Sequence, residues 1–268
     1  MSANQDRKAR DEVSTQVNKS PATRRANTPR HGVARVISKL GLGSRTEAAR
    51  WIQQGRVSVN GRTVRDPEKP VRQGVDRIEI DGKSPTAAPL LVLMMNKPRG
   101  LVTTTSDERN RDTVYCCFEG AELPWLAPIG RLDKASEGLL LFCNDPVWAA
   151  RITSPDEGPD KTYHVQIDRP VDSQMLAALR GGAMLGSERL MAKSISQLRS
   201  GTKTAWLEVV LSEGRNRHIR RLMSAFAVSV LRLVRVAIGP LTLGELAKGK
   251  WRILTPEEVR SLQPTRAK

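Results

Sequence analysis

The sequence predicts an α+β protein in which a small helix-turn-helix plus hairpin unit precedes a larger, mainly antiparallel mixed sheet. Apolar residues of the first patterned segment repeat with helical spacing, whereas the longer second part carries strand patterns at irregular intervals with short helical segments between them. Because no regular strand–helix–strand rhythm is present, a doubly wound parallel fold is not expected.

Charge is the dominant feature of the composition. The 268 residues carry a formal net charge of +16, and 39% of them are hydrophobic, which is enough for a core. A balance this basic favours a polyanionic partner, and nucleic acid is the leading candidate. The sequence has no apolar run long enough to span a membrane and no lipidation motif, so we expect no membrane association.

Cysteine and histidine usage indicates neither a metal site nor a disulfide framework. Cys116 and Cys117 are adjacent and Cys143 is distant, which fits no zinc spacing, and the histidines are scattered. We therefore expect no metal, and we expect the cysteines to be small core residues in a reducing compartment. The N-terminus has no apolar signal region, so a cytoplasmic location is expected.

Composition divides the chain into five parts. Residues 1–30 are nearly free of large apolar side chains and are expected to be a disordered basic arm, which either contacts RNA phosphates or is a solvated tail. Residues 31–82 form the first domain, 83–89 a Pro-, Ser- and Ala-rich linker, 90–262 the second domain and 263–268 a tail.

In the first domain, apolar positions at helical spacing predict a helix over 33–40, which Gly41 and Gly43 end. Ser44 and Glu47 have the spacing of a capping box and predict the start of a second helix, which Gly55 ends. The pair Asn60-Gly61 predicts a tight hairpin turn after the strand pattern at Val57 and Val59.

In the second domain, apolar runs and alternating patterns predict strands, with short helices between them. Strands are expected at 90–95, 139–143, 162–167, 204–211 and 230–238. Helices are expected near 146–153, 172–180 and 218–226, with a last helix that begins at Thr255-Pro256-Glu257-Glu258.

The stretch RVISKLGLGSRTEAARWIQQGRVSVNGRTVRDP resembles the S4 RNA-binding domain. In that family, two helices present basic and polar groups to structured RNA. The resemblance implies RNA contacts from the matching basic and polar positions, which are Arg35, Lys39, Ser44, Arg45, Arg50, Gln54, Arg56 and Asn60. Solvation of a helical face explains any one of these residues but explains the set poorly.

A polar turn, GRLDKAS, leads into the apolar strand run EGLLLFC. On spacing alone, an Asp in such a turn is most often a local cap. However, GRLDKASEGLLLFCND resembles the catalytic motif of the pseudouridine synthases that carry an N-terminal S4 domain and act on small- or large-subunit ribosomal RNA. The resemblance implies that Asp133 is the nucleophile and that Arg131 occupies the space that the target uridine leaves when it flips out.

Two further segments carry the same resemblance. KTYHV resembles the family's K-x-Y motif, which implies that Tyr163 stacks on the target base and accepts a proton. EGRNRHIRRLM resembles the family's E-G-R-N-R-Q-I-R-R-M motif, which implies that Arg220 pairs with Asp133 and that Asn216 and Arg217 contact the substrate. His218 replaces the usual Gln, and Cys143 replaces the usual Thr in the preceding motif.

The resemblance covers roughly residues 33–262 and implies isomerisation of uridine to pseudouridine in ribosomal RNA, either free or in a pre-ribosomal particle, by a monomer. The reaction involves no redox change, and the sequence has no Walker or G-x-G-x-x-G motif, so no cofactor is expected. One alternative is a non-catalytic S4-type RNA-binding or ribosome-assembly protein, and another is a nucleoside glycosidase, which would need a second acidic group.

Overall fold

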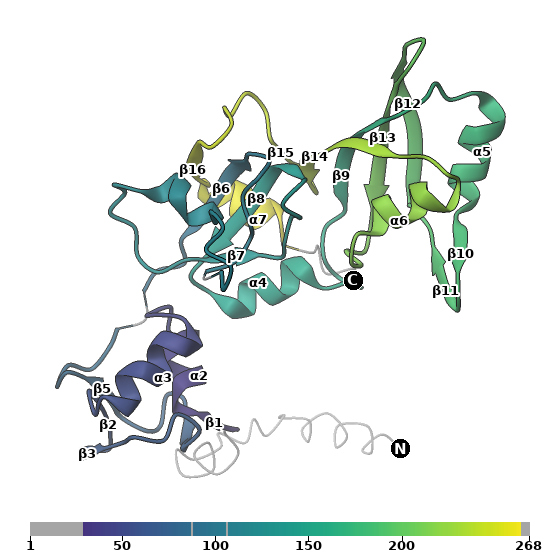
Figure 1. Ribbon diagram of the computed structural model, residues 1–268. Coiled ribbons are helices and arrows are strands. Elements are labelled where there is room, and N and C mark those ends of the chain that lie inside the picture. The colour runs from purple at the N-terminus through teal and green to yellow at the C-terminus, as the bar shows by residue number, and fades with distance from the viewer. Residues whose placement is uncertain (1–28, 87, 106, 264–268) are drawn as a thin grey trace, which may run out of the picture.

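The computed structural model describes residues 29–86, 88–105 and 107–263. An N-terminal module lies beside a larger domain built on one sheet (Figure 1). The predicted arm and tail lie outside the described residues except for residues 29, 30 and 263. Each helix in the described ranges is too short or too polar to span a lipid bilayer.

The N-terminal module, residues 30–80, packs two helices against short antiparallel strands. Its elements are β1 (Arg30–Gly32), α2 (Val33–Lys39), α3 (Arg45–Gln53), β2 (Val57–Val59), β3 (Arg62–Thr63), β4 (Pro70–Arg72) and β5 (Ile78–Ile80). The predicted capping box starts α3, since the Ser44 hydroxyl accepts from the Glu47 amide at 3.0 Å and the Glu47 carboxylate accepts from the Ser44 amide at 2.9 Å.

The predicted hairpin turn joins β2 and β3. Asn60 and Gly61 both have positive φ angles, 52° and 77°, which a tight two-residue turn requires. The pairing of β1 with β4 was not predicted, because these three-residue strands lack an alternating apolar pattern.

The larger domain has a mixed, mainly antiparallel sheet, which confirms the predicted α+β class. In the described residues its strand order is β12-β13-β9-β14-β8-β6-β16, with β7 beside β8 and β15 beside β14. Only the β14–β8 pairing is parallel among these neighbours. The strands are β6 (Val92–Lys97), β7 (Ala127–Ile129), β8 (Glu137–Cys143), β9 (Lys161–Ile167), β12 (Ser194–Ser200), β13 (Ala205–Leu211), β14 (Val230–Ile238), β15 (Leu241–Thr242) and β16 (Trp251–Ile253).

Every helix and strand that the sequence predicted in this domain is present. The helices are α4 (Pro146–Thr153), α5 (Ser173–Gly181), α6 (His218–Ala225) and α7 (Pro256–Ser261), and a separate hairpin is formed by β10 (Ala183–Leu185) and β11 (Glu188–Leu190). The strands β7, β10, β11, β12, β15 and β16 were not predicted, because most of them are only two or three residues long.

Two hydrophobic cores lie on opposite faces of the sheet. On the first face, α5 and α6 pack with Leu140, Val165 and Leu207 from the strands. On the second face, α4 and the end of α7 pack on Leu139 and Leu141 of β8. The helices of the second face therefore cover the sheet near β6 and β8.

The short 3-10 helix η1 (Val114–Phe118) carries two of the cysteines. Cys116 is exposed, Cys117 is half-buried and Cys143 is buried. The prediction that all three are core residues is therefore wrong for Cys116. The helix points this side chain outward while Val114 and Phe118 pack against the first core.

Asn144, at the end of β8, fixes the point at which the linker enters the larger domain. Its buried side chain accepts from the Leu91 amide at 2.9 Å and donates to the Pro89 carbonyl at 2.8 Å. Its backbone oxygen lies 3.0 Å from the position that a Cβ on Gly41 would occupy. The N-terminal module therefore approaches the larger domain closely at Gly41.

The parallel pairing of β8 and β14 depends on a glycine. Gly138 has a φ of 101°, and a Cβ there would lie 2.2 Å from the Arg235 carbonyl oxygen of β14. No side chain fits at this distance without separating the two strands.

We predict that Gly138→Ala lowers the free energy of unfolding by at least about 3 kcal/mol, because it adds a clash to an unfavourable φ. Urea denaturation measures this change. Gly100→Ala is the matched control, since Gly100 has a φ of 102° and open space within 4 Å of the position that a Cβ would occupy. This variant should lower the free energy of unfolding by only about 1–2 kcal/mol. Equal losses for the two variants would contradict a requirement for close strand approach.

Candidate active site

The loop formed by residues 130–136 connects β7 to β8 and carries Asp133. It starts at Gly130, which has a φ of 70°, and it is anchored by Leu132, which is buried in the first core. The Ser136 amide donates to the Asp133 carbonyl at 2.9 Å, so the chain turns tightly immediately after Asp133. Asp133 itself is half-buried, which leaves its side chain accessible to a substrate.

A second segment, which follows β6, holds this loop in place. The Gly100 amide donates to the Lys134 carbonyl at 2.8 Å, and the Thr103 hydroxyl donates to the Leu132 carbonyl at 2.8 Å. The 130–136 loop is therefore bound through its main chain, and this leaves the side chains of Arg131 and Asp133 free of these contacts.

Lys97, at the end of β6, is the functional residue that sequence reasoning missed. Its side chain is fully buried, and its ammonium group donates to the carbonyls of Pro98, Asp133 and Ser136 at 3.1, 3.3 and 2.9 Å. Burial lowers the pKa of this ammonium to about 8, although the charges of Asp133 and Glu137 act in the opposite direction. A lysine that ends an apolar strand run and precedes Pro-Arg-Gly was the available signal.

Tyr163 lies in the middle of β9, on the face of the sheet that α6 covers. It pairs with Arg235 of β14, which in turn pairs with Gly138 at the start of β8. Its side chain is 9% exposed and belongs to the same core as Leu132 and Ile219. The 130–136 loop, β9 and α6 therefore contribute side chains to one hydrophobic core, and Tyr163 lies at its margin with 9% of its surface exposed.

Arg220 connects α6 to the 130–136 loop. Its guanidinium donates to the Ala135 carbonyl at 3.2 Å and to the Val230 carbonyl at 3.1 Å. Burial, reinforced by the nearby charge of Arg217, lowers the pKa of Arg220, and the charge of Asp133 opposes this shift.

The expected ion pair between Arg220 and Asp133 is not formed. In the described ranges, no salt bridge within 4.0 Å joins these two residues. The guanidinium instead binds the main chain two residues after Asp133. Arg220 therefore contributes a nearby positive charge and an anchor for the loop rather than a direct contact with the carboxylate.

Exposed basic and polar groups lie on the loop and at the start of α6. Arg131 is exposed on the loop, and Asn216 and Arg217 are exposed where α6 begins. Arg217 has a left-handed backbone, with a φ of 49°, which turns the chain into α6. Arg215 and Arg221 are bound to Glu188 of β11, so they join the β10–β11 hairpin to this segment.

His218, which replaces the Gln usual in the resembling motif, is buried at the start of α6. Its ring nitrogens have no hydrogen-bond partner in the described part of the chain, and Nδ1 lies 3.9 Å from a Glu213 carboxylate oxygen. Burial lowers the pKa of His218, which favours the neutral imidazole. We therefore assign it to packing at the α6 terminus.

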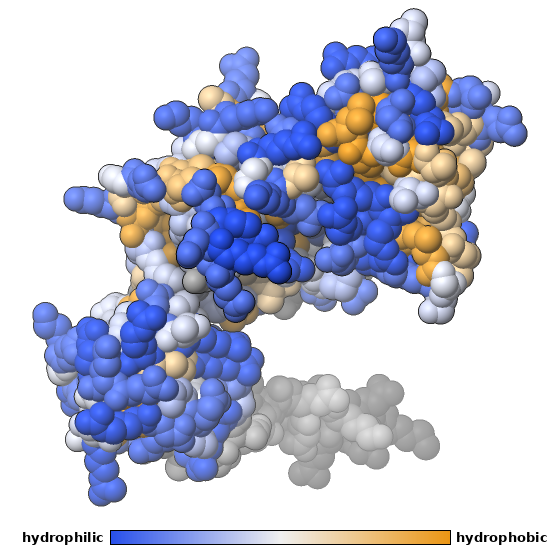
Figure 2. Space-filling model, viewed as in Figure 1, coloured by the Kyte–Doolittle hydropathy of each residue, from blue (hydrophilic) through white to orange (hydrophobic). Residues whose placement is uncertain are grey.

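The surface of the N-terminal module is almost entirely hydrophilic in Figure 2. Arg35, Arg45, Arg50 and Gln54 are exposed, and Lys39 is half-buried. These five predicted RNA contacts lie on or next to α2 and α3, and their side chains are available to a ligand.

The other three predicted RNA contacts already have structural partners. Ser44 caps α3. Arg56 donates to Asp81 at 2.6 Å and lies 5.6 Å from the centre of the Trp51 ring. The Asn60 side chain donates to Asp76 at 3.0 Å and accepts from the Arg77 amide at 2.9 Å.

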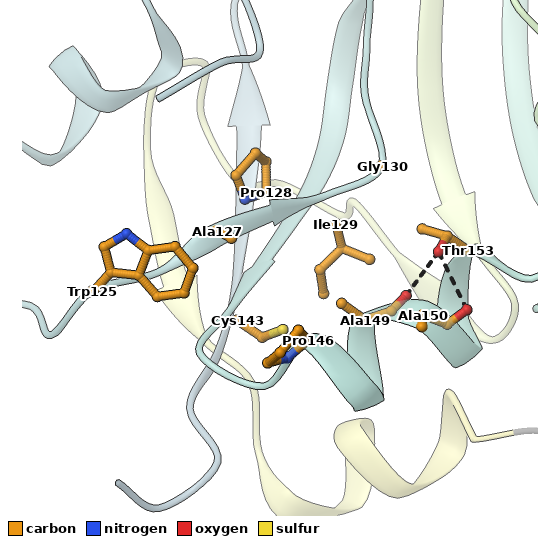
Figure 3. Close-up of a pocket in the computed structure, with 10 residues that line it drawn as sticks. All are labelled: Trp125, Ala127, Pro128, Ile129, Gly130, Cys143, Pro146, Ala149, Ala150 and Thr153. Carbon is orange, nitrogen blue, oxygen red and sulfur yellow. Dashed lines mark hydrogen bonds between the residues drawn. The ribbon is translucent and has the colours of Figure 1, made fainter. Parts of the chain in front are cut away.

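A separate apolar pocket of about 290 Å³ lies between β7, the end of β8 and α4 (Figure 3). Trp125, Pro128 and Cys143 line it, and Gly130 lies at one end. Its lining includes none of Asp133, Tyr163 and Arg220. The convergence of residues around Asp133 therefore indicates the candidate active site better than cavity size does.

Comparison with known sequences assigns the chain to a family. Residues 91–225 match the family model of the RNA pseudouridylate synthases, and residues 33–76 match that of the S4 domain. The chain belongs to the RNA pseudouridylate synthase family, and it is an RNA-modifying isomerase.

Similar proteins span most of the chain. It is 34% identical over 232 residues to an RNA pseudouridine synthase of Aquifex aeolicus, covering 86% of this chain and 92% of that one. It is 32% identical over 231 residues to ribosomal large subunit pseudouridine synthase B of Bacillus subtilis, covering 85% and 94%. A crystal structure of a pseudouridylate synthase matches with a TM-score of 0.61 and 30% identity, covering 87% and 99%.

We predict that the burial of Lys97 makes stability depend on pH. The unfolded chain binds more protons than the folded chain between the folded pKa of about 8 and the unfolded pKa of about 10.4, so stability rises with pH in this window. Between about pH 7.5 and about pH 9.5, the free energy of unfolding should rise by about 2 kcal/mol from this group.

Urea denaturation of wild type and Lys97→Met at the two pH values measures this contribution as the difference between their slopes. Lys250→Met, which removes an exposed lysine, is the control and should keep the wild-type slope. A Lys97→Met protein with the same pH dependence as wild type would show that the ammonium is not desolvated.

Proposed function

We propose that this isomerase converts a specific uridine of ribosomal RNA to pseudouridine, with Asp133 as the nucleophile. The observation that carries the proposal is that a half-buried carboxylate lies on a loop fixed by two cations, Lys97 and Arg220. The names of relatives from Bacillus subtilis and Haemophilus influenzae, both ribosomal large subunit pseudouridine synthase B, support ribosomal RNA and favour the large subunit.

The chemistry needs only groups that the site contains. The Asp133 carboxylate adds to ribose C1′ or removes the C2′ proton, and the bond from N1 to C1′ breaks. The detached uracil rotates and a bond forms between C5 and C1′, while the bond from Asp133 to C1′ breaks or, on the alternative route, the proton returns to C2′. N1 gains a proton and C5 loses one. Oxidation states balance without an outside reagent.

Tyr163 accepts the C5 proton in this proposal. Its position on β9 near the 130–136 loop supports a base that stacks on the uracil and removes the proton. Against the larger effect of burial, the charge of Asp133 raises the pKa of both Lys97 and Arg220, so both cations lie within electrostatic reach of this carboxyl.

The uridine must leave the stacked helix before Asp133 can reach C1′, because the glycosidic bond is inaccessible inside a duplex. Arg131 is exposed at the start of the loop and fills the vacated space. Asn216 and Arg217 contact the neighbouring backbone, since both are exposed at the start of α6, the helix whose Arg220 binds the loop.

The N-terminal module binds the surrounding RNA and sets the register. Most of these contacts come from Arg35, Lys39, Arg45, Arg50 and Gln54, because in the described part of the chain their side chains form no hydrogen bond or salt bridge. Ser44, Arg56 and Asn60 first stabilise the module and contact RNA secondarily. The enzyme acts as a cytoplasmic monomer on free ribosomal RNA or a pre-ribosomal particle.

We predict that Asp133→Asn lowers tritium release from ribosomal RNA labelled at uridine C5 by at least about a thousandfold, because the amide is not a nucleophile. The assay detects the reaction without knowledge of the target position, since bond formation at C5 expels the label. Asp172→Asn is the control, because Asn caps a helix as well as the Asp that caps α5.

Wild-type release with loss only in Asp133→Asn is the expected result. Release by both Asp133→Asn and wild type at similar rates would remove Asp133 from the mechanism. Release by neither, on free RNA and on immature subunits, would favour the non-catalytic RNA-binding alternative.

We also predict that Tyr163→Phe slows tritium release by about a hundredfold or more while RNA affinity changes by less than about threefold, because the ring remains and the base is lost. Tyr115→Phe is the matched control. It removes a hydroxyl that donates to the Leu126 carbonyl at 2.8 Å, so it should lower stability by about 1 kcal/mol and leave the rate unchanged. A fully active Tyr163→Phe enzyme would exclude this hydroxyl as the base.

A further inference from the structure

The second face of the sheet is covered by helices on one side of β14 and open on the other. Near β6 and β8 it is covered by α4 and α7, but over β12, β13, β9 and β14 its side chains are half-exposed. On β9, buried residues alternate with Thr162, His164 and Gln166, which are half-exposed on this face. In the described ranges, no hydrophobic core forms over this part of the sheet.

Four side chains form a row across this open face, which we call the sheet strip. Arg199 pairs with Trp206, Trp206 with Gln166, and Gln166 with Arg232, from β12 to β14. The guanidinium carbons of Arg199 and Arg232 lie 5.3 and 5.6 Å from the centre of the Trp206 ring. Four neighbouring strands place the ends of the row about 14 Å apart.

Trp206 does not contribute to a core. It is half-exposed and belongs to none of the hydrophobic clusters of the described residues. An aromatic ring between two guanidinium groups on an open sheet has the chemistry that stacks on nucleobases and attracts phosphates.

The strip ends beside the 130–136 loop. Arg232 donates to Glu137 at 3.1 and 3.2 Å, and Glu137 is the first residue of β8 after the loop. Pairing of β14 with β8 begins only at Val234, so residues 230–233 extend beyond the start of β8. Arg220 bridges this gap, because it binds both Val230 and Ala135.

The charges of the strip favour an anion. Both Arg232 and Lys248 bind Glu137, the Lys248 ammonium at 2.6 Å, so that carboxylate is outnumbered by cations. Burial raises the pKa of the Glu137 carboxyl, but these hydrogen bonds outweigh burial and keep it below its ordinary value. Arg199 is exposed, and in the described part of the chain it has no acidic partner within 4.0 Å.

We propose that the sheet strip binds a single-stranded RNA segment next to the target uridine, by stacking on Trp206 and by phosphate contacts with Arg199 and Arg232. The proposal rests on the proposed function for the identity of the RNA. It gives the substrate a second contact surface, distinct from the N-terminal module, on the face of the sheet opposite to Tyr163, and this surface ends at Glu137, directly after the 130–136 loop.

The test compares two uridine-labelled RNAs that contain the same stem-loop, one ending at the stem and one with single-stranded extensions on both sides. The variants are Trp206→Leu and Arg199→Ala. Trp125→Leu is the matched control, because Trp125 is also half-exposed but lines the pocket of Figure 3. Tritium release gives KM and kcat for each RNA.

For the extended RNA we expect both strip variants to raise KM by about tenfold with kcat unchanged, as loss of one stacked base or one phosphate contact predicts. For the short RNA we expect wild-type values, and Trp125→Leu should match wild type on both. Photo-crosslinking of 4-thiouridine in the extensions to wild type should label the peptide that contains Trp206.

The proposal would be overturned by equal KM values on the extended RNA for Trp206→Leu, Arg199→Ala and Trp125→Leu, or by crosslinks that avoid β12 and β13. Either result would favour a protein as the partner that binds this face. The crosslink needs no turnover. An absence of tritium release by wild type would therefore count against the proposed function, while the crosslink would still show whether the sheet strip binds RNA.

Discussion

The buried ammonium of Lys97 is the interaction on which the site depends. A flexible loop would let Asp133 occupy many positions, yet three main-chain carbonyls around it converge on one fully buried cation. Carbonyl oxygens cannot replace the hydration of an ammonium group completely, which is why its pKa falls to about 8. The fold therefore accepts an unfavourable burial of charge, and this burial fixes the backbone of the proposed nucleophile, as is common where function requires precise geometry.

The parallel β8–β14 pair adds a second constraint. Gly138 lets the two backbones approach, and the pairing starts at Val234, so the sheet is open between β14 and the 130–136 loop. Arg220 spans this opening through two carbonyls, and Tyr163 lies on the neighbouring strand. Under the proposed function, a substrate base that entered here would meet the carboxylate and the phenol from different elements.

Local rules predicted the elements that depend on local chemistry. The capping boxes at Ser44 and Thr255 and the Asn60-Gly61 turn are present as expected, because each is determined by a few adjacent residues. The strands β12 and β16 were missed, because their pairing depends on distant partners rather than on their own pattern. Lys97 was missed for the same reason, since its acceptors Asp133 and Ser136 lie far away in the sequence. The roles of Asp133, Tyr163 and Arg220 came from resemblance to a family, and the contacts of Arg220 differ from those expected.

Base flipping explains why such an enzyme needs contacts far from Asp133. Extrusion of a uridine costs a few kcal/mol of stacking and pairing, and the small site around Asp133 cannot supply this with selectivity for one uridine among many. Phosphate contacts on the N-terminal module would supply affinity that depends little on sequence. A stacking surface such as the sheet strip holds unpaired bases and disfavours a continuous duplex, so it selects RNA in which the target lies beside a single strand. Selectivity would then come from RNA shape at two separated surfaces, while the site itself needs to recognise only a uracil.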